Sequence, residues 1–404
     1  MSTPLNRLAP LGVALVLSTA GLAACGSNSD NSSSNSSSSS SSGGVSAACS
    51  LDNPPTSSAQ GRPGGDPGKA SGKVGAILPD TTSSTRYTLY DQPLLKKNLS
   101  AAGLQPDVQN AGGSDSKQAA IAQSMVGEGV KVLILDSINI PSGVGVEKQA
   151  TQAGVKVIDY DRVNLGGTAD YYVSYDNQDV GRLQAQTMVD CLNAQGVTNP
   201  KIIMMDGGTD VDNNAVLFAK GAHEVLDPLV KEGKLTIVSE SVVKGWTISN
   251  AAPTFTQALT AAGGQVDGVV AANDDIANAV IGVLKGSGLN GHVVVTGQDA
   301  GVNGLQNVIT GQQSMTIFKN VQNEAKAASN LAITLVQGKT PAAAGMTMTK
   351  FDDPESPSRN LPALLLPPEV ITQANVQDII DAGALTKAEI CKGIESDCAK
   401  IGLS

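Results

Sequence analysis

The sequence predicts an α/β protein with two lobes, each built on a doubly wound parallel sheet. From residue 73 onward, short runs rich in β-branched residues alternate with segments of helical spacing, which is the pattern of successive β-α-β units. The runs are apolar along most of their length, as strands are when helices cover both faces of a sheet. About 330 residues follow position 72, and that is too many for one sheet and one core. Two lobes are therefore expected.

The individual elements follow from these runs. Strands are predicted at residues 73–78, 130–135, 155–160, 201–205, 235–238, 266–271, 293–296 and 314–318. Helices are predicted at residues 116–127, 180–194, 213–226, 250–262 and 277–286. The chain is expected to cross between the lobes near Asp176 and Lys319. The first lobe then contains residues 73–176 and 320–345, and the second contains residues 177–319 and 346–404.

The first quarter of the chain has a different composition. Residues 1–24 have the basic start, apolar run and small residues of an export signal. Residues 22–26 resemble the lipobox of bacterial lipoproteins, which implies diacylglycerol on the Cys25 thiol and an anchor on the outer face of the cell membrane. The alternative is a plain cleaved signal followed by a chance cysteine. Residues 25–72, rich in Ser, Gly and Pro, are predicted to form a tether.

The charge balance excludes several classes of partner. The chain has 27 basic and 37 acidic residues and a net charge of −10. No basic cluster is present, so we expect no nucleic acid partner and no attraction to anionic lipid through basic residues. With only two histidines, His223 and His292, a His-rich metal site or a His-based catalytic relay is not expected.

The cysteines suit an exported protein. Four of them follow Cys25, and an oxidising compartment permits disulfides. Cys391 and Cys398 are close in sequence and form one predicted pair, but four cysteines allow three connectivities. No C-x-x-C motif points to zinc or to a thioredoxin-like site.

Familiar ligand motifs are incomplete. The glycines at 143–145 lack a third glycine, and those at 207–208 lack the Gly-Lys-Ser/Thr ending of a phosphate loop. The aspartates within 206–212 lack the spacing and closing Glu of a calcium loop. Without a nucleophile elbow or companion base, hydrolysis is not expected. We predict no enzymatic activity, no cofactor and no metal.

Polar residues just after the predicted strands form the candidate site, because ligands gather at the carboxyl ends of parallel strands. Trp246, the single tryptophan, is either a core residue or an apolar plate for the C–H face of a sugar ring. The second role predicts that its removal weakens binding and leaves thermal unfolding little changed. Carboxylates accept hydrogen bonds, Arg and Lys donate them and Asn does both, which suits a polyol. These residues around Trp246 are Arg86, Asp161, Arg162, Asp212, Asn214, Asn273, Asp299 and Lys319. A cluster of ion pairs between the lobes is the alternative.

From residue 73 to about 391, the sequence resembles the periplasmic sugar-binding proteins of ABC importers, in their D-xylose-binding branch. The resemblance lies in ordered motifs: Val157-Ile-Asp-Tyr-Asp-Arg162, Tyr175-Asp-Asn177, Gly207-Gly-Thr-Asp-Val-Asp-Asn-Asn214, Lys244-Gly-Trp246, Val269-Val-Ala-Ala-Asn-Asp274, Gly297-Gln-Asp299, Ser314-Met-Thr-Ile-Phe-Lys319 and Pro357-Ser-Arg359.

The resemblance implies a type I periplasmic binding fold, with two Rossmann-like lobes joined by a three-segment hinge. It implies that a monosaccharide, D-xylose or a related aldose, binds in the cleft through Trp246 and its eight polar neighbours. It also implies hinge closure on the sugar and docking of a monomer on an ABC permease. Residues 80–85 and Tyr87 depart from the family pattern, which leaves glucose, galactose and arabinose open. A sensor that presents its closed form to a membrane kinase or chemoreceptor is the alternative function.

Overall fold

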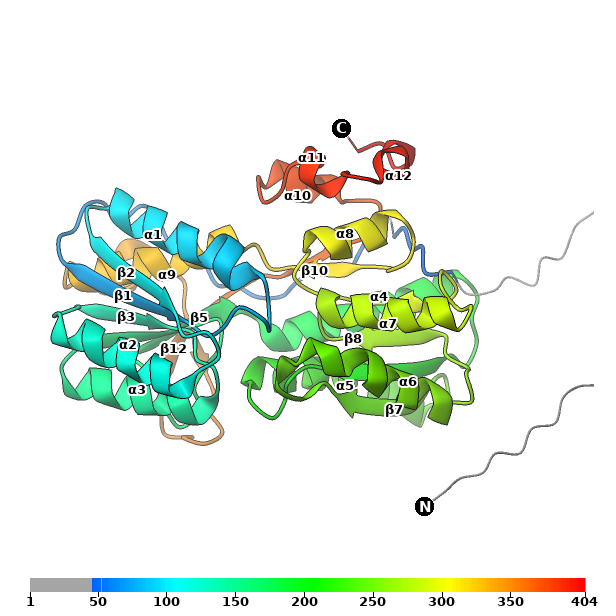
Figure 1. Ribbon diagram of the computed structural model, residues 1–404, viewed down its shortest axis with the longest axis horizontal. Helices are drawn as coiled ribbons and strands as arrows, with labels where there is room; N and C mark the ends of the chain where they lie inside the picture. Colours follow the sequence, from blue (N-terminus) through cyan, green and yellow to red (C-terminus); the bar gives the residue numbers. More distant parts are fainter. Residues whose placement is uncertain (1–45, 52, 404) are drawn as a thin grey trace, which may run out of the picture. The chain divides into compact units, whose positions relative to one another are not determined.

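The computed structural model describes residues 46–51 and 53–403. The predicted signal segment and Cys25 lie outside these residues. Within them the fold has two large sheets, one parallel and one parallel except at one edge strand, both covered by helices, which confirms the predicted fold class (Figure 1). No helix in the described part of the chain is long and apolar enough to cross a membrane.

The first lobe is built on a seven-stranded sheet in the order β11-β12-β5-β4-β3-β1-β2. All pairs are parallel except β11 with β12. The strands are β1 (Lys73–Leu78), β2 (Gln105–Asn110), β3 (Val132–Leu135), β4 (Lys156–Tyr160), β5 (Tyr171–Tyr175), β11 (Thr349–Phe351) and β12 (Leu361–Leu366). The helical elements are the π-helical turn η1 (Tyr87–Asp91), α1 (Gln92–Ala101), α2 (Asp115–Gly127), α3 (Ile140–Gln152) and α9 (Val321–Val336).

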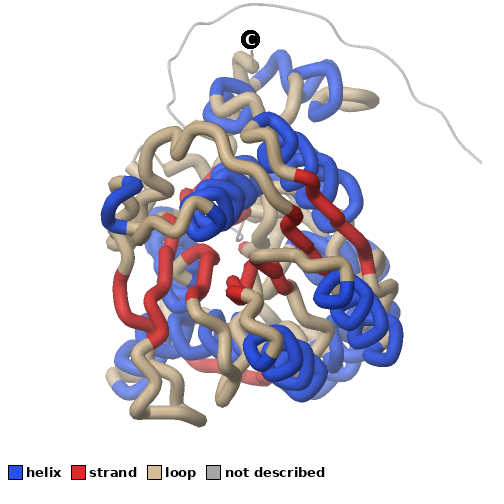
Figure 2. Tube along the Cα trace, turned by 90° about the vertical axis from the view of Figure 1, so that its left-hand side faces the viewer, coloured by secondary structure: helices blue, strands red, loops and turns tan. Residues whose placement is uncertain are grey.

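Helices flank both faces of this sheet (Figure 2), and β3 shows why the strands are continuously apolar. Successive side chains of a strand point to opposite faces. Val132 and Ile134 pack in the core shared with α1 and α9, whereas Leu133 and Leu135 pack in the core shared with α2 and α3. All four side chains of β3 are therefore buried.

The second lobe is built on a four-stranded parallel sheet in the order β7-β6-β8-β9. The strands are β6 (Lys201–Asp206), β7 (Thr236–Val242), β8 (Gly268–Ala271) and β9 (Val294–Val295). The α-helices are α4 (Asn177–Ala194), α5 (Asn213–Lys231), α6 (Ala251–Ala261), α7 (Asp274–Gly286) and α8 (Val302–Ile309). The short 3-10 helices are η2 (Lys244–Trp246) and η3 (Ile248–Asn250).

Close packing of α4 and α5 fixes the position of the α5 N-terminus. Helix α5 buries Ala215, Phe218, Ala222 and Leu226, which lie on one face because they are three or four residues apart. A Cβ atom at Gly221 would overlap the α4 backbone. The absence of a side chain at this position therefore lets the two helix backbones meet.

The remaining elements lie toward the C-terminus. Strands β10 (Thr316–Phe318) and β13 (Glu369–Ile371) form a two-stranded antiparallel sheet. The helical elements are η4 (Ala342–Ala344), α10 (Gln377–Asp381), α11 (Lys387–Ile390) and α12 (Glu395–Lys400). The last two helices are joined by the Cys391–Cys398 disulfide, which confirms that predicted pair.

The described chain beyond β1 crosses between the sheets three times, after β5, β10 and β12. The crossings are hydrogen-bonded to one another: Tyr175 Oη donates to the Asn320 carbonyl at 2.9 Å, and the Asp176 N–H donates to the Leu366 carbonyl at 3.1 Å. The first two crossings lie where the sequence predicts them.

The third crossing corrects the predicted lobe boundary. Residues 346–404 are expected in the second lobe, but β11 and β12 belong to the first-lobe sheet. The apolar strand β12 pairs in parallel with β5, which leaves β5 paired on both edges. The return to the second lobe therefore comes between β12 and β13, about 20 residues later than predicted.

The described part of the predicted tether, residues 46–51 and 53–72, is packed against both lobes, and we call it the strap. At its start a disulfide joins Cys49 to Cys191 of α4. Further on, the Gly61 N–H donates to the Leu365 carbonyl of β12 at 3.0 Å, and Asn330 Nδ2 of α9 donates to the Pro63 carbonyl at 3.3 Å. The prediction of a free tether extending to residue 72 is therefore wrong, because a disulfide and backbone hydrogen bonds hold a segment that has few apolar side chains.

Candidate functional site

The nine predicted site residues line one cavity between the two lobes, with about 330 Å³ of unoccupied space, part of it open to solvent. Most of them come from the carboxyl end of a strand or the start of a helix, whereas Trp246 ends η2 and Asp299 lies in the loop between β9 and α8. The first lobe contributes Arg86, Asp161 and Arg162; the second lobe and the crossing after β10 contribute Asp212, Asn214, Trp246, Asn273, Asp299 and Lys319.

Arg86, just before η1, is fixed by two carboxylates behind it. Its Nε and Nη2 donate to Asp91 at 3.0 and 2.9 Å, and Nη2 also donates to Glu324 of α9 at 2.5 Å. Its Nη1 lies 3.5 Å from Asp161 Oδ1. Among the described residues, this Nη1 is buried without a hydrogen-bond partner. The guanidinium therefore faces the cavity with one donor group unused.

Asp161 follows β4 in a left-handed backbone conformation with φ of 59°. Such a conformation is uncommon for a residue with a side chain and is often maintained at functional sites. Its carbonyl accepts hydrogen bonds from Ser174 Oγ at 2.9 Å and from Asn214 Nδ2 of the second lobe at 2.9 Å. Its carboxylate accepts from Tyr87 Oη at 3.2 Å. The backbone bonds hold the residue in the conformation that directs its side chain to the cavity.

Opposing effects act on the pKa of Asp161. Burial alone raises it, but the charges of Arg86, Lys319 and Arg162 outweigh burial and lower the pKa to about 2. Asp161 is therefore an ionised hydrogen-bond acceptor at any physiological pH.

Arg162 connects the walls of the two lobes. Its Nη1 donates to the Ser137 carbonyl and its Nη2 to Ser83 Oγ, both at 3.2 Å. Its Nε lies 3.5 Å from Asp212 Oδ2 and makes no hydrogen bond with the described residues. A second unused donor thus lies close to the second-lobe wall.

Trp246 forms the aromatic part of the second-lobe wall. Its Nε1 donates to Asp212 Oδ2 at 3.1 Å, and Phe218 packs edge-on with ring centroids 6.4 Å apart. A Cβ atom at Gly207 or Gly208 would overlap the indole, so both glycines let the ring lie on the backbone. Only 6% of Trp246 is exposed, and it belongs to the second-lobe core. Trp246 is therefore a core residue that also lines the cavity. Its burial predicts that its removal lowers stability, in contrast to the expectation from the sequence.

The remaining predicted residues complete the wall. Asn273 and Asp212 cap α7 and α5, accepting hydrogen bonds from the Ile276 and Asn214 N–H groups at 2.9 and 2.8 Å. Lys319 Nζ lies 3.7 Å from Asp161 Oδ1 and 4.0 Å from Asp299 Oδ1. These distances are longer than hydrogen bonds, so the ammonium retains capacity for another acceptor.

The structure adds Ser83, Phe218 and Gln298 to the cavity wall, which the sequence reasoning missed. Tyr87, which the resemblance singles out as a departure from the family pattern, also lines the cavity. The guanidinium carbons of Arg86 and Arg162 each lie 5.7 Å from the Tyr87 ring centroid. The buried carboxylate of Asp136, without a hydrogen-bond partner in the described chain, lies 3.9 Å behind Arg162 Nε. Asp136 directly follows β3, so the strand-end signal used for the other residues would have found it.

Carboxylates outnumber cations around the cavity, and burial changes their protonation. Burial raises the pKa of Asp136 well above its usual range and raises that of Glu324 to about 7. Burial also raises the pKa of Asp212. Protons on such carboxyls offset the excess negative charge. The wall therefore presents cations, an ionised carboxylate, amides and aromatic rings at once.

Comparison with known proteins places this arrangement in a family. A model of the periplasmic binding protein domain matches residues 75–340. The chain belongs to the periplasmic binding protein family. Members of this family are binding proteins, so this periplasmic binding protein is not an enzyme.

Several relatives of this periplasmic binding protein are named for sugars. It is 35% identical to the D-xylose-binding periplasmic protein of Escherichia coli (strain K12) over 290 residues, which cover 72% of this chain and 84% of that protein. It is 33% identical to a multiple sugar-binding periplasmic receptor of Rhizobium radiobacter over 334 residues, covering 80% of this chain and 92% of that protein. These relatives agree with the resemblance that the motifs indicate.

A solved structure shares the fold of this periplasmic binding protein. A carbohydrate transporter solute-binding protein from Chloroflexus aurantiacus, in complex with D-glucose, superposes with a TM-score of 0.70 at 28% identity. The match covers 79% of this chain and 98% of that chain. The two-lobed architecture is thus that of a sugar-transporter solute-binding protein.

Proposed function

We propose that this protein binds a monosaccharide, D-xylose or a related aldose, in the cavity between its lobes. The observation that carries this proposal is a set of buried charged atoms at the cavity wall, Arg86 Nη1, Asp161 Oδ1 and Arg162 Nε, that make no hydrogen bond in the described chain. Their nearest opposite charges lie 3.5 Å away or more, in ion pairs too long for hydrogen bonds. Leaving a buried polar group unpaired costs about 1–3 kcal/mol. Sugar hydroxyls both donate and accept, so a bound sugar would supply the missing partners.

The aromatic rings support a sugar rather than a small ion. Tyr87 belongs to the first lobe and Trp246 to the second, and both line the cavity. An aromatic ring offers an apolar surface to the C–H groups of a pyranose, while the charged side chains satisfy its hydroxyl edge. A sugar ring can contact the aromatic surfaces with its C–H groups and the charged side chains with its hydroxyls.

The function includes closure of the lobes. The proposed contacts come from both lobes, so the sugar binds the closed form more tightly than the open form. Its binding energy then shifts the population toward closure about the three crossings. The closed form is the state that would dock on an ABC-type permease, as part of a sugar importer.

Relatives support an aldose but differ in the sugar that their names give. The relative from Escherichia coli is named for D-xylose, whereas the Chloroflexus aurantiacus structure holds D-glucose. We place D-xylose first because two relatives at 33–35% identity carry that name. The Rhizobium radiobacter relative is called a receptor, which supports sugar sensing as the second candidate function.

We further propose that the protein acts as a monomer outside the cytoplasmic membrane, anchored through lipid on Cys25. The lipobox-like residues 22–26 support the anchor, and Cys25 itself lies outside the described residues. The described chain begins at Ser46, against the second lobe, where Ser46 N–H donates to Gln195 Oε1 at 2.6 Å.

A thermal-shift screen tests the proposed ligand class. A ligand that binds only the native state stabilises it by about 2.7 kcal/mol at 100 times its Kd. We expect D-xylose, D-glucose, D-galactose or L-arabinose at millimolar concentration to raise the melting temperature, with D-mannitol as an open-chain control. A melting temperature unmoved by all four aldoses would argue against monosaccharide binding. Sugar uptake lost on deletion of the gene would favour transport, and intact uptake would favour sensing.

A further inference from the structure

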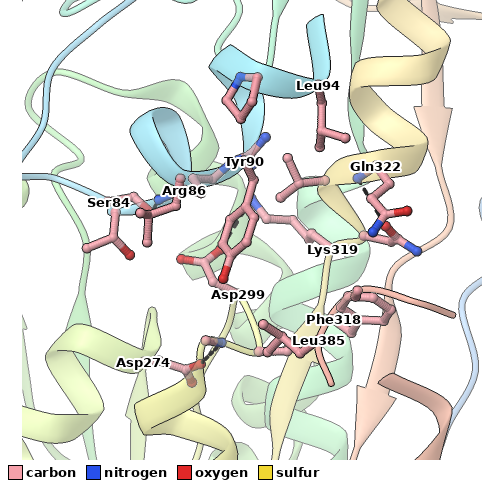
Figure 3. Close-up of a pocket in the computed structure, with 18 of the residues that line it drawn as sticks. Ser84, Arg86, Tyr90, Leu94, Asp274, Asp299, Phe318, Lys319, Gln322 and Leu385 are labelled. Carbon is pink, nitrogen blue, oxygen red and sulfur yellow. Dashed lines mark hydrogen bonds and ion pairs between the residues drawn. The ribbon is translucent and has the colours of Figure 1, made fainter. Parts of the chain in front are cut away.

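A second, larger cavity adjoins the proposed sugar cavity (Figure 3). We call it the outer cavity and the proposed sugar cavity the inner cavity. The outer cavity has about 1040 Å³ of unoccupied space and the inner cavity about 330 Å³, and both volumes include space open to solvent. The two cavities share four wall residues, Ser84, Arg86, Asp299 and Lys319. A single layer of side chains therefore separates them.

The outer cavity has a different chemistry from the inner one. Its walls are formed mainly by apolar and aromatic side chains of η1, α1, β10, α9 and the C-terminal segment, namely Leu89, Tyr90, Leu94, Phe318, Val321 and Leu385. Figure 3 shows Tyr90 and Leu94 across from Phe318 and Leu385, around a common space. Leu89 is 60% exposed and is one of three large hydrophobic side chains that stand exposed in the described chain. Apolar surface left open in a hollow is typical of a binding site.

Asp299 is the most exposed of the three charged residues in the shared wall. Its side chain is 22% exposed, whereas Arg86 and Lys319 are about 5% exposed. Its Oδ1 accepts a hydrogen bond from the adjacent Gln298 Nε2 at 3.2 Å and lies 4.0 Å from Lys319 Nζ, which is too long for a hydrogen bond. Asp299 is therefore the charged side chain of the shared wall that is most accessible to solvent.

We propose that the outer cavity binds an apolar substituent on the anomeric carbon of the sugar, so that the protein takes aryl or alkyl glycosides as well as free monosaccharides. This inference rests on the proposed function of the inner cavity. Only a ligand that joins a polyol ring to an apolar group matches both cavities and the wall that they share. Charges of both signs, Lys97 and Lys319 with Asp275 and Asp299, also line the outer cavity, which favours an uncharged substituent.

Closure strengthens this assignment. The outer cavity takes walls from first-lobe helices, from the second-lobe loop at 299–301 and from the C-terminal segment at 384–385. A substituent there contacts both lobes, as the sugar does, and therefore adds to the preference for the closed form. The apolar substituent and the sugar ring would both stabilise the closed form of the protein.

Isothermal titration of the full protein tests the subsite. The probes are the phenyl α- and β-glycosides of D-xylose and D-glucose, each compared with its own free sugar. We expect at least one phenyl glycoside to bind at least tenfold more tightly than its free sugar, which corresponds to about 1.4 kcal/mol. Leu89→Ser and Leu385→Ser are each expected to remove most of this gain and to leave affinity for the free sugar unchanged.

A matched control is Val230→Ser, since Val230 is 39% exposed on α5 and does not line the outer cavity. It should preserve the gain. If the free sugars bind and no phenyl glycoside binds more tightly, the subsite is refuted while the proposed function stands. The subsite is equally refuted if the gain survives both Leu variants. If neither sugars nor glycosides bind, the proposed function and the subsite are overturned together.

Discussion

Replacing Trp246 by alanine is expected to weaken the fold as well as sugar binding. The side chain is 6% exposed and packs with Phe218 in the second-lobe core. Truncating a buried tryptophan costs about 3–5 kcal/mol. At roughly 2–4 °C per kcal/mol for domains of 150–250 residues, the melting temperature of the free protein should fall by about 6–20 °C.

The loss of affinity has a separate physical cause. The variant removes an aromatic wall of the proposed sugar cavity and deprives Asp212 Oδ2 of the indole N–H that it accepts at 3.1 Å. A loss of at least about tenfold in affinity, or about 1.4 kcal/mol, is expected. Trp246→Phe keeps an aromatic ring but no N–H donor, so its affinity should lie between those of the wild type and the alanine variant.

Scanning calorimetry of the free protein and isothermal titration with the sugar separate the two effects. Titrations are made well below the melting temperature of each variant, with circular dichroism to verify that it is folded. A folded Trp246→Ala protein with unaltered affinity would remove the indole from the binding site. An unaltered melting temperature would contradict its place in the core.

Four further predictions follow from individual side chains. Asp161→Asn removes the ionised acceptor among Arg86, Lys319 and Arg162. It should weaken sugar binding roughly 10- to 150-fold by isothermal titration, since a hydrogen bond to a charged group contributes about 1.5–3 kcal/mol. An affinity within threefold of the wild type would contradict the role of Asp161 as a sugar acceptor. Replacing Cys49 and Cys191 by serine removes a disulfide between residues 142 apart in sequence and should lower the free energy of unfolding in urea by about 2–5 kcal/mol. The same change at Cys391 and Cys398, which are 7 residues apart, should cost less because a shorter loop restricts the unfolded chain less. Equal losses would contradict this dependence on loop length. Burial raises the pKa of Asp274 to about 8 from about 3.9 in the unfolded chain, so between these pH values folding takes up a proton and the free energy of unfolding falls as pH rises. Urea unfolding at pH 5 and pH 8 should show this fall, and Asp274→Asn should reduce it. A pH dependence of stability identical to that of the wild type would refute the raised pKa of Asp274. Cys25→Ser should move the protein from the membrane fraction to the medium or periplasm, and continued membrane retention would rule out the lipid anchor.

The sequence predicts the central strands well because strands buried on both faces consist mainly of apolar residues. β3 is apolar throughout and β1 is apolar after Lys73, and both are found at or within their predicted positions. β2 was missed because it is an edge strand with the polar sequence Gln-Pro-Asp-Val-Gln-Asn, of which only Val108 is buried. An edge strand pairs on one side only, so it needs little apolar sequence.

The strap and part of the site depend on distant contacts that no local pattern encodes. The described strap is polar, and what holds it is the bond from Cys49 to a cysteine 142 residues away, together with backbone hydrogen bonds to β12. Arg86 is fixed by Glu324, 238 residues further along the chain. The Arg86–Glu324 pair forms only because the topology places α9 beside η1, and no local sequence pattern predicts that placement.

The site residues themselves could be predicted because strand ends meet at one edge of each sheet. Asp161, Asp299 and Lys319 each follow a strand and all line the cavity. Tyr87 is the first residue of η1 and does not follow a strand, so the rule of strand ends does not place it at the cavity.

A crystal structure of the protein with D-xylose at saturating concentration tests sugar binding between the lobes most directly. We expect electron density for one sugar ring in this cavity, with hydroxyl oxygens within hydrogen-bonding distance of Asp161 Oδ1, Arg86 Nη1 and Arg162 Nε. An empty cavity, or a sugar bound elsewhere while those three atoms still make no hydrogen bond, would contradict the proposed function.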